Sequence, residues 1–424
     1  MLNRTVAPAF KQVNDINFIK PTAKQLKNGL PVYIVNAGEQ ELVRIEFIFE
    51  NVNWNAKKSL QAVAVNGLIN SGTKTLTAKE IAEKVDYYGA FLQTEYGSDF
   101  ITITLYSLTK HLPSVLPILW SVLNESIFPQ HELDIYKQNQ KQKLQVSLQK
   151  NDFLARKNFA NALFGETSYG SDISLDDYDQ LQQHDLLEYF KAAFQSDNCT
   201  IIVAGKFVDK DFEVLDRVFG GAWENSAAAV KNSFQFQAQE GKDLYIEKPE
   251  ALQSAIRMGN LSINRKHVDF PSLQILNCVF GGYFGSRLMA NIREDKGYTY
   301  GIGSGIASLK YAGYFFIATE VGADVCASAL KEIEKEINIL RSDLIAEEEL
   351  DLVRNFMLGS LLGSLENAFS HADKFKNIHF AGLGYDYYEN YIHTVKNITA
   401  ERLKEIANQY LDWNAMTRVV VGKK

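Results

Sequence analysis

The side chains that most often hold metal ions are widely scattered along this chain. Its seven histidines include no pair three to five residues apart, and the nearest pair, His371 and His379, is eight apart. Two ligands on one helix face need the closer spacing, so a local zinc motif is excluded. Cys199, Cys278 and Cys326 are also far apart, which favours small core residues over a disulfide framework or a metal knuckle. We therefore expect no metal ion in this chain.

A different chemistry depends on Arg293 and Tyr300, seven residues apart. A guanidinium offers a planar fork of donors to carbonyl or carboxylate oxygens, and a phenol can donate a hydrogen bond to a developing oxyanion. Gly297, followed by β-favouring residues, predicts that a helix ends before a turn and a strand. Arg293 would then lie at the helix end and Tyr300 on the strand. Taken alone, these residue types favour an exposed arginine and a half-buried strand tyrosine.

The glycines after Tyr300 predict a second property of that strand. Gly301 and Gly303 do not fit the GxGxxG spacing of a dinucleotide loop. Glycine in a strand lets another backbone approach closely. This suits a peptide that adds to the sheet edge as an extra strand.

Short matches recur in order along the chain and indicate an internal duplication. Ser-Leu-Gln at 59–61 recurs at 272–274, Glu-Leu-Asp at 132–134 recurs at 349–351, and Gly-Lys at 205–206 recurs at 422–423. The last two pairs share an offset of 217 residues, and the first has an offset of 213. The order and the nearly constant offset favour two copies of one unit.

The same elements are predicted in both copies. Alternating segments at 91–94 and 101–105 predict a β-hairpin, as do those at 298–309 and 314–320. Thr77 and Glu80 form a capping-box pattern, and Leu330, Ile333, Ile337 and Leu340 share one helix face. We predict an α+β fold of two tandem homologous domains, each a mainly antiparallel sheet covered by helices on one face. The domains would occupy 1–222 and 243–424, joined by a linker at 223–242 of small and polar residues.

Composition excludes several classes of protein. The 424 residues carry a net charge of -7, so nothing indicates the basic surface that nucleic acid requires. No apolar run approaches the roughly 18 residues that span a bilayer, so no membrane partner is expected. The N-terminus lacks the apolar core of a signal peptide. We expect a cytoplasmic protein, or a periplasmic one if a signal peptide has been removed.

Residues 281–300, GGYFGSRLMANIREDKGYTY, resemble the second-domain signature of the pitrilysin/insulinase (M16) zinc peptidases. That family has duplicated α+β domains of about this size, so the resemblance covers essentially the whole chain and implies the LuxS/MPP-like fold. In active members a first-domain helix carries the zinc motif His-x-x-Glu-His, soon followed by Gly-Thr. Here Gly72-Thr73 and the capped helix are present, but the zinc motif is not.

Three substitutions remove the metal chemistry that the family would supply. Val63 and Gly67 stand at the two imidazole positions, and neither has a lone pair for a metal. Asn66 stands where the general-base glutamate would be, and an amide is not basic near neutral pH. The third ligand, a glutamate, should fall near 143–145, yet no glutamate occurs between Leu133 and Gly165. The resemblance thus implies a degenerate metal motif without zinc.

The resemblance assigns function to the other half of the site. It implies that Arg293 and Tyr300 bind substrate and stabilise the oxyanion. Gly301 and Gly303 are further candidate substrate-binding residues, because their strand would suit an added peptide strand. The chain would then be a catalytically incomplete metalloendopeptidase subunit, inactive alone. It would act on unfolded peptides as a heterodimer with a homologous M16 subunit that holds zinc on an intact His-x-x-Glu-His motif.

One alternative is a non-catalytic scaffold or peptide-binding protein of the same fold, like the core subunits of respiratory complexes. Retention of both Arg293 and Tyr300 argues against it, because a scaffold does not need this pair. A stand-alone hydrolase with unrelated chemistry has little support, since no GxSxG motif occurs.

Overall fold

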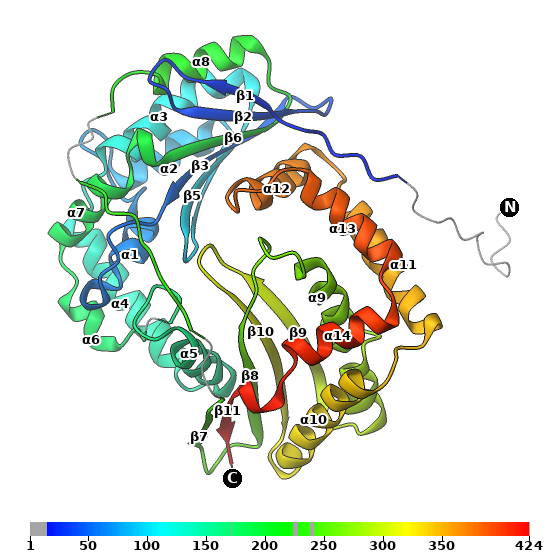
Figure 1. Ribbon diagram of the computed structural model, residues 1–424. Coiled ribbons are helices and arrows are strands. Elements are labelled where there is room, and N and C mark those ends of the chain that lie inside the picture. Colours follow the sequence, from blue (N-terminus) through cyan, green and yellow to red (C-terminus); the bar gives the residue numbers. More distant parts are fainter. Residues whose placement is uncertain (1–14, 171, 224–227, 238–240, 424) are drawn as a thin grey trace, which may run out of the picture.

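The computed structural model describes residues 15–423 except 171, 224–227 and 238–240. Within these residues the chain forms two sheets, one from each half (Figure 1). The first half contains strands β1 (Thr22–Gln25), β2 (Pro31–Asn36), β3 (Leu42–Glu50), β4 (Phe91–Tyr96), β5 (Phe100–Leu108) and β6 (Cys199–Gly205). Its helices are α1 (Gln61–Leu68), α2 (Ala78–Tyr87), α3 (Leu112–Glu125), α4 (Gln130–Ser147), α5 (Asn151–Phe164), α6 (Leu175–Gln180), α7 (Gln183–Ala193) and α8 (Asp209–Phe219).

The second half repeats this series of elements. Its strands are β7 (Asp243–Glu247), β8 (Gln253–Ser262), β9 (Thr299–Ser308), β10 (Gly313–Gly322) and β11 (Thr417–Gly422). Its helices are α9 (Phe270–Asn277), α10 (Cys326–Ser342), α11 (Glu347–Gly363), α12 (Ala368–His379), α13 (Asp386–Asn397) and α14 (Ala400–Tyr410), with two π-helical segments, η4 (Cys278–Gly282) and η5 (Met289–Asp295). None of the described helices is both long and apolar enough to cross a membrane.

The strand order confirms the internal duplication. The first sheet runs β1-β2-β6-β3-β5-β4 and the second β7-β11-β8-β10-β9. Apart from β1 the two orders are the same, and in each only one pair, β2 with β6 and β7 with β11, is parallel. The predicted hairpins are β4–β5 and β9–β10. Helices α4 and α11 begin at Gln130 and Glu347, which are 217 residues apart, the offset found in the sequence.

The local signals explain individual elements. The Thr77 hydroxyl accepts a hydrogen bond from the Glu80 amide, and the Glu80 carboxylate accepts one from the Thr77 amide at 2.8 Å, so the predicted capping box starts α2. On α10, Ile333, Ile337 and Leu340 are buried, as the period of 3.6 residues predicts. The predicted α+β class, with mainly antiparallel sheets covered by helices, is confirmed.

Each sheet has a second face, which a helix from the other half of the chain covers. Helix α5 packs on β8 and β11 of the second sheet, where Phe159 meets Ala255 and Val419 in one cluster. Helix α12 packs on β2 and β6 of the first sheet, where Ala372 meets Ile202. The two halves thus exchange one helix each, and α12 lies between them in Figure 1.

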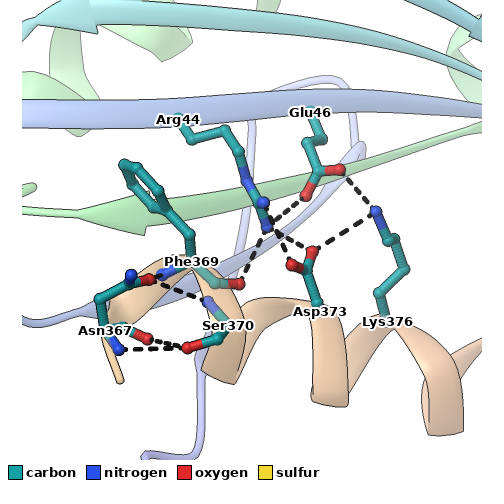
Figure 2. A network of polar contacts seen from close by, with 7 residues as sticks. All are labelled: Arg44, Glu46, Asn367, Phe369, Ser370, Asp373 and Lys376. Carbon is teal, nitrogen blue, oxygen red and sulfur yellow. Dashed lines mark hydrogen bonds and ion pairs between the residues drawn. The ribbon is translucent and has the colours of Figure 1, made fainter. Parts of the chain in front are cut away.

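A charge network fixes α12 to the first sheet (Figure 2). Arg44 and Glu46 alternate with the core-facing residues of β3 and are 7% and 3% exposed. The Arg44 guanidinium donates to Asp373 at 2.7 Å and to the Phe369 carbonyl at 3.1 Å, and it pairs with Glu46 at 2.9 Å. Lys376 pairs with Glu46 at 2.7 Å. Every charge in the network therefore has an opposite partner, as burial requires.

Within the predicted linker, residues 228–237 contact the first half of the chain, whereas Gly241 and Lys242 bond to Asn414 and Arg418 of the second half. The Asn53 amide donates to the Val230 carbonyl at 2.9 Å, and the Trp54 amide donates to Asn232 at 2.8 Å. Phe234 and Phe236 pack in the cluster around α5. Residues 224–227 and 238–240 of the linker lie outside the described residues, and the boundaries at 222 and 243 stay predictions.

Candidate functional site

The degenerate metal motif lies on α1, the helix where the resemblance places it. Asn66 is buried, and its Oδ1 atom has no hydrogen-bond partner among the described residues. Val63 is half-buried on the same helix. Neither side chain supplies an imidazole nitrogen or a carboxylate, so these positions do not fit a zinc ion.

Tyr136 of α4 fills the space beside Gly67. A Cβ atom built on Gly67 would lie 2.7 Å from Cε2 of the Tyr136 ring. Burial raises the pKa of the Tyr136 phenol above its ordinary value, so the group is neutral. The position of the family's second imidazole is therefore closed by an aromatic ring, which spacing in the sequence did not reveal.

The third ligand position lies further along α4. Lys143 and Gln145 are exposed there, and Leu144 packs against the first core. Throughout the described part of the chain, no three His, Cys, Asp or Glu side chains gather in a group that could hold a metal ion.

Arg293 and Tyr300 come together where η5 ends and β9 begins. The Lys296 amide donates to the Asn291 carbonyl, and the Tyr298 amide donates to the Ile292 carbonyl at 3.0 Å, so the backbone turns back on itself. Gly297 has a φ of 64°, a left-handed conformation that favours glycine. The predicted order of helix end, turn and strand is confirmed, with Arg293 in the last helical turn and Tyr300 on the strand.

The two side chains lie against each other on the surface. The Arg293 guanidinium carbon is 5.2 Å from the centroid of the Tyr300 ring and 4.8 Å from that of Phe284. Tyr300 is 91% exposed and Phe284 is 64% exposed. Neither the Arg293 guanidinium nor the Tyr300 hydroxyl makes a hydrogen bond or ion pair with any described residue. Their donor groups are available, and the cation–π contacts hold the guanidinium between two rings.

Other residues of the same signature position this pair. Arg287 forms a two-pronged ion pair with Glu349 of α11, with distances of 2.8 and 2.7 Å. The side-chain amide of Asn291 donates to the carboxylate of Glu336 on α10 at 2.7 Å and to that of Glu332 at 3.0 Å. Hydrogen bonding to Glu349 raises the pKa of Arg287, which keeps the guanidinium charged. The sequence analysis assigned these residues no role, although both lie inside the recognised stretch.

Gly301 and Gly303 lie on β9, one of the two edge strands of the second sheet. The Gly301 amide donates to the Thr299 hydroxyl at 3.0 Å, and its carbonyl accepts from the Thr319 hydroxyl at 3.0 Å. A Cβ atom on Gly303 would lie 3.5 Å from the Gly281 carbonyl of η4. The backbone that approaches Gly303 is therefore part of this chain. Their role with a peptide substrate stays a prediction.

Comparisons with known proteins show which family this chain resembles. The profile described as "Peptidase M16 inactive domain" matches residues 180–357. An "Uncharacterized zinc protease YmxG" of Bacillus subtilis is 27% identical over 70% of this chain and 73% of its own length. A "Non-peptidase homolog YmxG" of Helicobacter pylori is 22% identical over 84% of this chain and 83% of its own.

A solved structure extends the likeness to almost every element. The crystal structure titled "peptidase M16 inactive domain from Pseudomonas fluorescens" superposes with a TM-score of 0.86 at 22% identity, covering 95% of this chain and 98% of that one. The fold is thus the M16 fold, and α1 carries the substituted motif. Residues 180–357 of this chain thus match the M16 inactive-domain profile, and almost the whole chain shares the fold of a solved M16 inactive domain.

Proposed function

We propose that this chain is the Arg/Tyr-carrying subunit of a two-chain M16 metalloendopeptidase. Its partner would be a homologous subunit with an intact His-x-x-Glu-His motif, which would hold the zinc ion. One observation carries the proposal: Arg293 and Tyr300 lie side by side with unused donors, in a chain whose own metal positions cannot bind a metal.

Each residue of the pair has a distinct task in peptide hydrolysis. The Arg293 guanidinium would donate to a carbonyl or carboxylate oxygen of the bound peptide and fix its position. The Tyr300 hydroxyl would donate to the oxyanion that forms when the scissile carbonyl is attacked. Because no described residue competes for these donors, the substrate would be their first hydrogen-bonding partner other than water.

The exposure of the pair supports a site that a partner completes. Tyr300 and Phe284 present two aromatic rings to solvent on either side of one cation. Exposed aromatic residues beside an arginine are typical of the centre of a protein interface. A facing subunit would exclude water from the pair, and exclusion of water strengthens hydrogen bonds to a developing charge.

The test is reconstitution with the zinc-motif homologue from the same organism. The isolated chain should neither retain stoichiometric zinc nor cleave an unfolded peptide, while the mixed pair should do both. In the pair, Tyr300→Phe should lower kcat by about 10²- to 10³-fold, the usual effect of losing one oxyanion donor. Arg293→Ala should raise KM as well as lower kcat, whereas Arg293→Lys should recover only part of the loss because it lacks the planar fork.

The matched control is Tyr87→Phe, which removes a hydroxyl that is also strongly exposed, on α2. This variant should keep the wild-type rate. Peptidase activity of the isolated chain would refute the proposal. Wild-type rates for both the Arg293 and Tyr300 variants in an active pair would instead indicate the scaffold alternative.

A further inference from the structure

The second half contains a cavity of about 410 Å³ that is separate from the Arg293–Tyr300 pair. It lies among α9, η4, α11, α12 and α13, and its wall includes Arg265, Phe356, Ser364, Lys374 and Tyr391. By the duplication, α9 and α11 correspond to α1 and α4. In the first half the space beside that helix pair is closed by Tyr136, whereas in the second half it is open.

The charged groups on the cavity wall are all cationic. Arg265 and Lys374 line it, and no described aspartate or glutamate does. The Lys374 amine makes no hydrogen bond and no ion pair within 4 Å with a described residue. The carboxylate that acts on it from a longer distance, Asp373, is already bound by Arg44 at 2.7 Å. Burial lowers the pKa of Lys374, which an anion in the cavity would reverse.

Arg265 is held in place by neutral acceptors. It donates to the Asn377 carbonyl at 2.8 Å and to the Ser308 hydroxyl at 3.3 Å. Its remaining guanidinium hydrogens have no acceptor among the described residues. The arginine is thus positioned, and its charge is not neutralised by a salt bridge.

The rest of the wall is aromatic and apolar. Tyr387 and Tyr391 line one side, and Phe356 and Met357 of α11 line another. Burial raises the pKa of Tyr391, so its hydroxyl is neutral and can donate a hydrogen bond. A ligand that satisfies both kinds of surface must combine an anionic group with an apolar body, and the volume is within the range of small-ligand sites.

We propose that this cavity binds a carboxylate attached to an apolar side chain. Two sources share this chemistry: the C-terminal residue of a peptide and a free N-acyl amino acid. The carboxylate would pair with Lys374 and Arg265, and the side chain would lie against Phe356 and Tyr391. Phe356 also packs against Tyr283 with tilted rings whose centroids are 4.8 Å apart, so the cavity adjoins the segment that carries Phe284 and Arg293. This inference does not depend on the proposed peptidase role.

The experiment is calorimetric titration of the full-length chain with three probes. They are a pentapeptide that ends in phenylalanine with a free carboxylate, the same peptide as its C-terminal amide, and N-acetyl-phenylalanine. The free acids should bind at one site, and the amide should bind at least 10-fold more weakly because it lacks the charge. Tighter binding of the peptide than of N-acetyl-phenylalanine assigns the site to peptide termini, and the reverse order assigns it to free acids.

Variants locate the site. Lys374→Met keeps the length of the side chain and should weaken binding of the free acids at least 10-fold. Lys331→Met, at an exposed position on α10, should leave their affinity unchanged. Equal affinity for the acid and the amide would overturn the proposal without any variant. So would unchanged binding in Lys374→Met, or the absence of saturable binding by either acid.

Discussion

The ring of Tyr136 occupies the space that a side chain at position 67 would need, with 2.7 Å between Cε2 and a Cβ built on Gly67. The loss of the zinc motif is therefore more than a change of three side chains on α1. A side chain at this position on α1 would therefore have to displace the Tyr136 ring of α4.

This contact predicts that Gly67→Ala changes the free energy of unfolding in opposite directions, depending on whether Tyr136 is present. Alanine normally stabilises a helix by about 0.5–1 kcal/mol relative to glycine. At position 67 the new methyl group must displace Tyr136, and overpacking costs about 1–3 kcal/mol. Gly67→Ala should thus destabilise the wild type but stabilise a Tyr136→Ala background, as measured by urea unfolding. Equal effects in both backgrounds would contradict the role of the ring.

The network between β3 and α12 predicts a large loss of stability when one of its carboxylates is replaced by an uncharged amide. Glu46 is 3% exposed and pairs with both Arg44 and Lys376. Glu46→Gln leaves two partly buried cations to share Asp373, and loss of a buried partner costs about 3–5 kcal/mol.

The matched control for this substitution is Glu83→Gln, which breaks the exposed pair of Glu83 with Lys79 on α2. It should change the free energy of unfolding by less than about 0.5 kcal/mol. Denaturant titrations of the two variants, with m-values compared to confirm two-state behaviour, measure the difference. Similar small effects would show that the network contributes little.

Two histidines predict a loss of stability in mild acid. Burial lowers the pKa of His371 and His379 below the ordinary 6.5. As the pH falls toward and below 6.5, these histidines take up protons in the unfolded chain before they do so in the folded one. The free energy of unfolding therefore falls as the pH drops from about 7 through the lowered pKa values. His371 also accepts a hydrogen bond from the Ile19 amide at 3.2 Å, and protonation would remove this acceptor.

Glutamine at position 371 keeps an acceptor but does not titrate. His371→Gln should therefore make the unfolding free energy less steep with pH between 7 and 5. His393→Gln, which alters an exposed imidazole on α13, is the control and should leave the slope as it is. A slope that is unchanged in His371→Gln would show that other groups cause the pH dependence.

The exposure of Arg293 and Tyr300 predicts that substitutions of this pair change function much more than stability. Tyr300 is 91% exposed and contributes one surface cation–π contact, so Tyr300→Ala should cost less than about 1 kcal/mol of stability. Tyr189, at 4% exposed in the first core, should cost about 3–5 kcal/mol on the same change. Thermal unfolding of the two variants tests this, and a large loss in Tyr300→Ala would assign Tyr300 a structural role.

Local patterns predicted much of the fold. The capping box at Thr77, the hairpins and the turn at Gly297 depend on neighbouring residues, so the sequence shows them directly. The repeated offset of 217 residues places α5 and α12 as equivalent helices, but it does not reveal that each crosses to the opposite sheet. Arg44 and Asp373 are 329 residues apart, and no periodicity connects them. The closure at Gly67 and the cavity at Lys374 depend on packing between helices, which one sequence does not show.

The exchange of α5 and α12 makes the two halves resemble a swapped homodimer whose subunits have been joined end to end. A fragment that stops before residue 223 would carry α5 without the sheet it covers, and its own sheet would lack α12. Separate expression of either fragment would expose apolar strands, so splitting the gene at the linker should yield soluble protein only when both pieces are made together. We therefore expect the two copies to fold and unfold as a single cooperative unit.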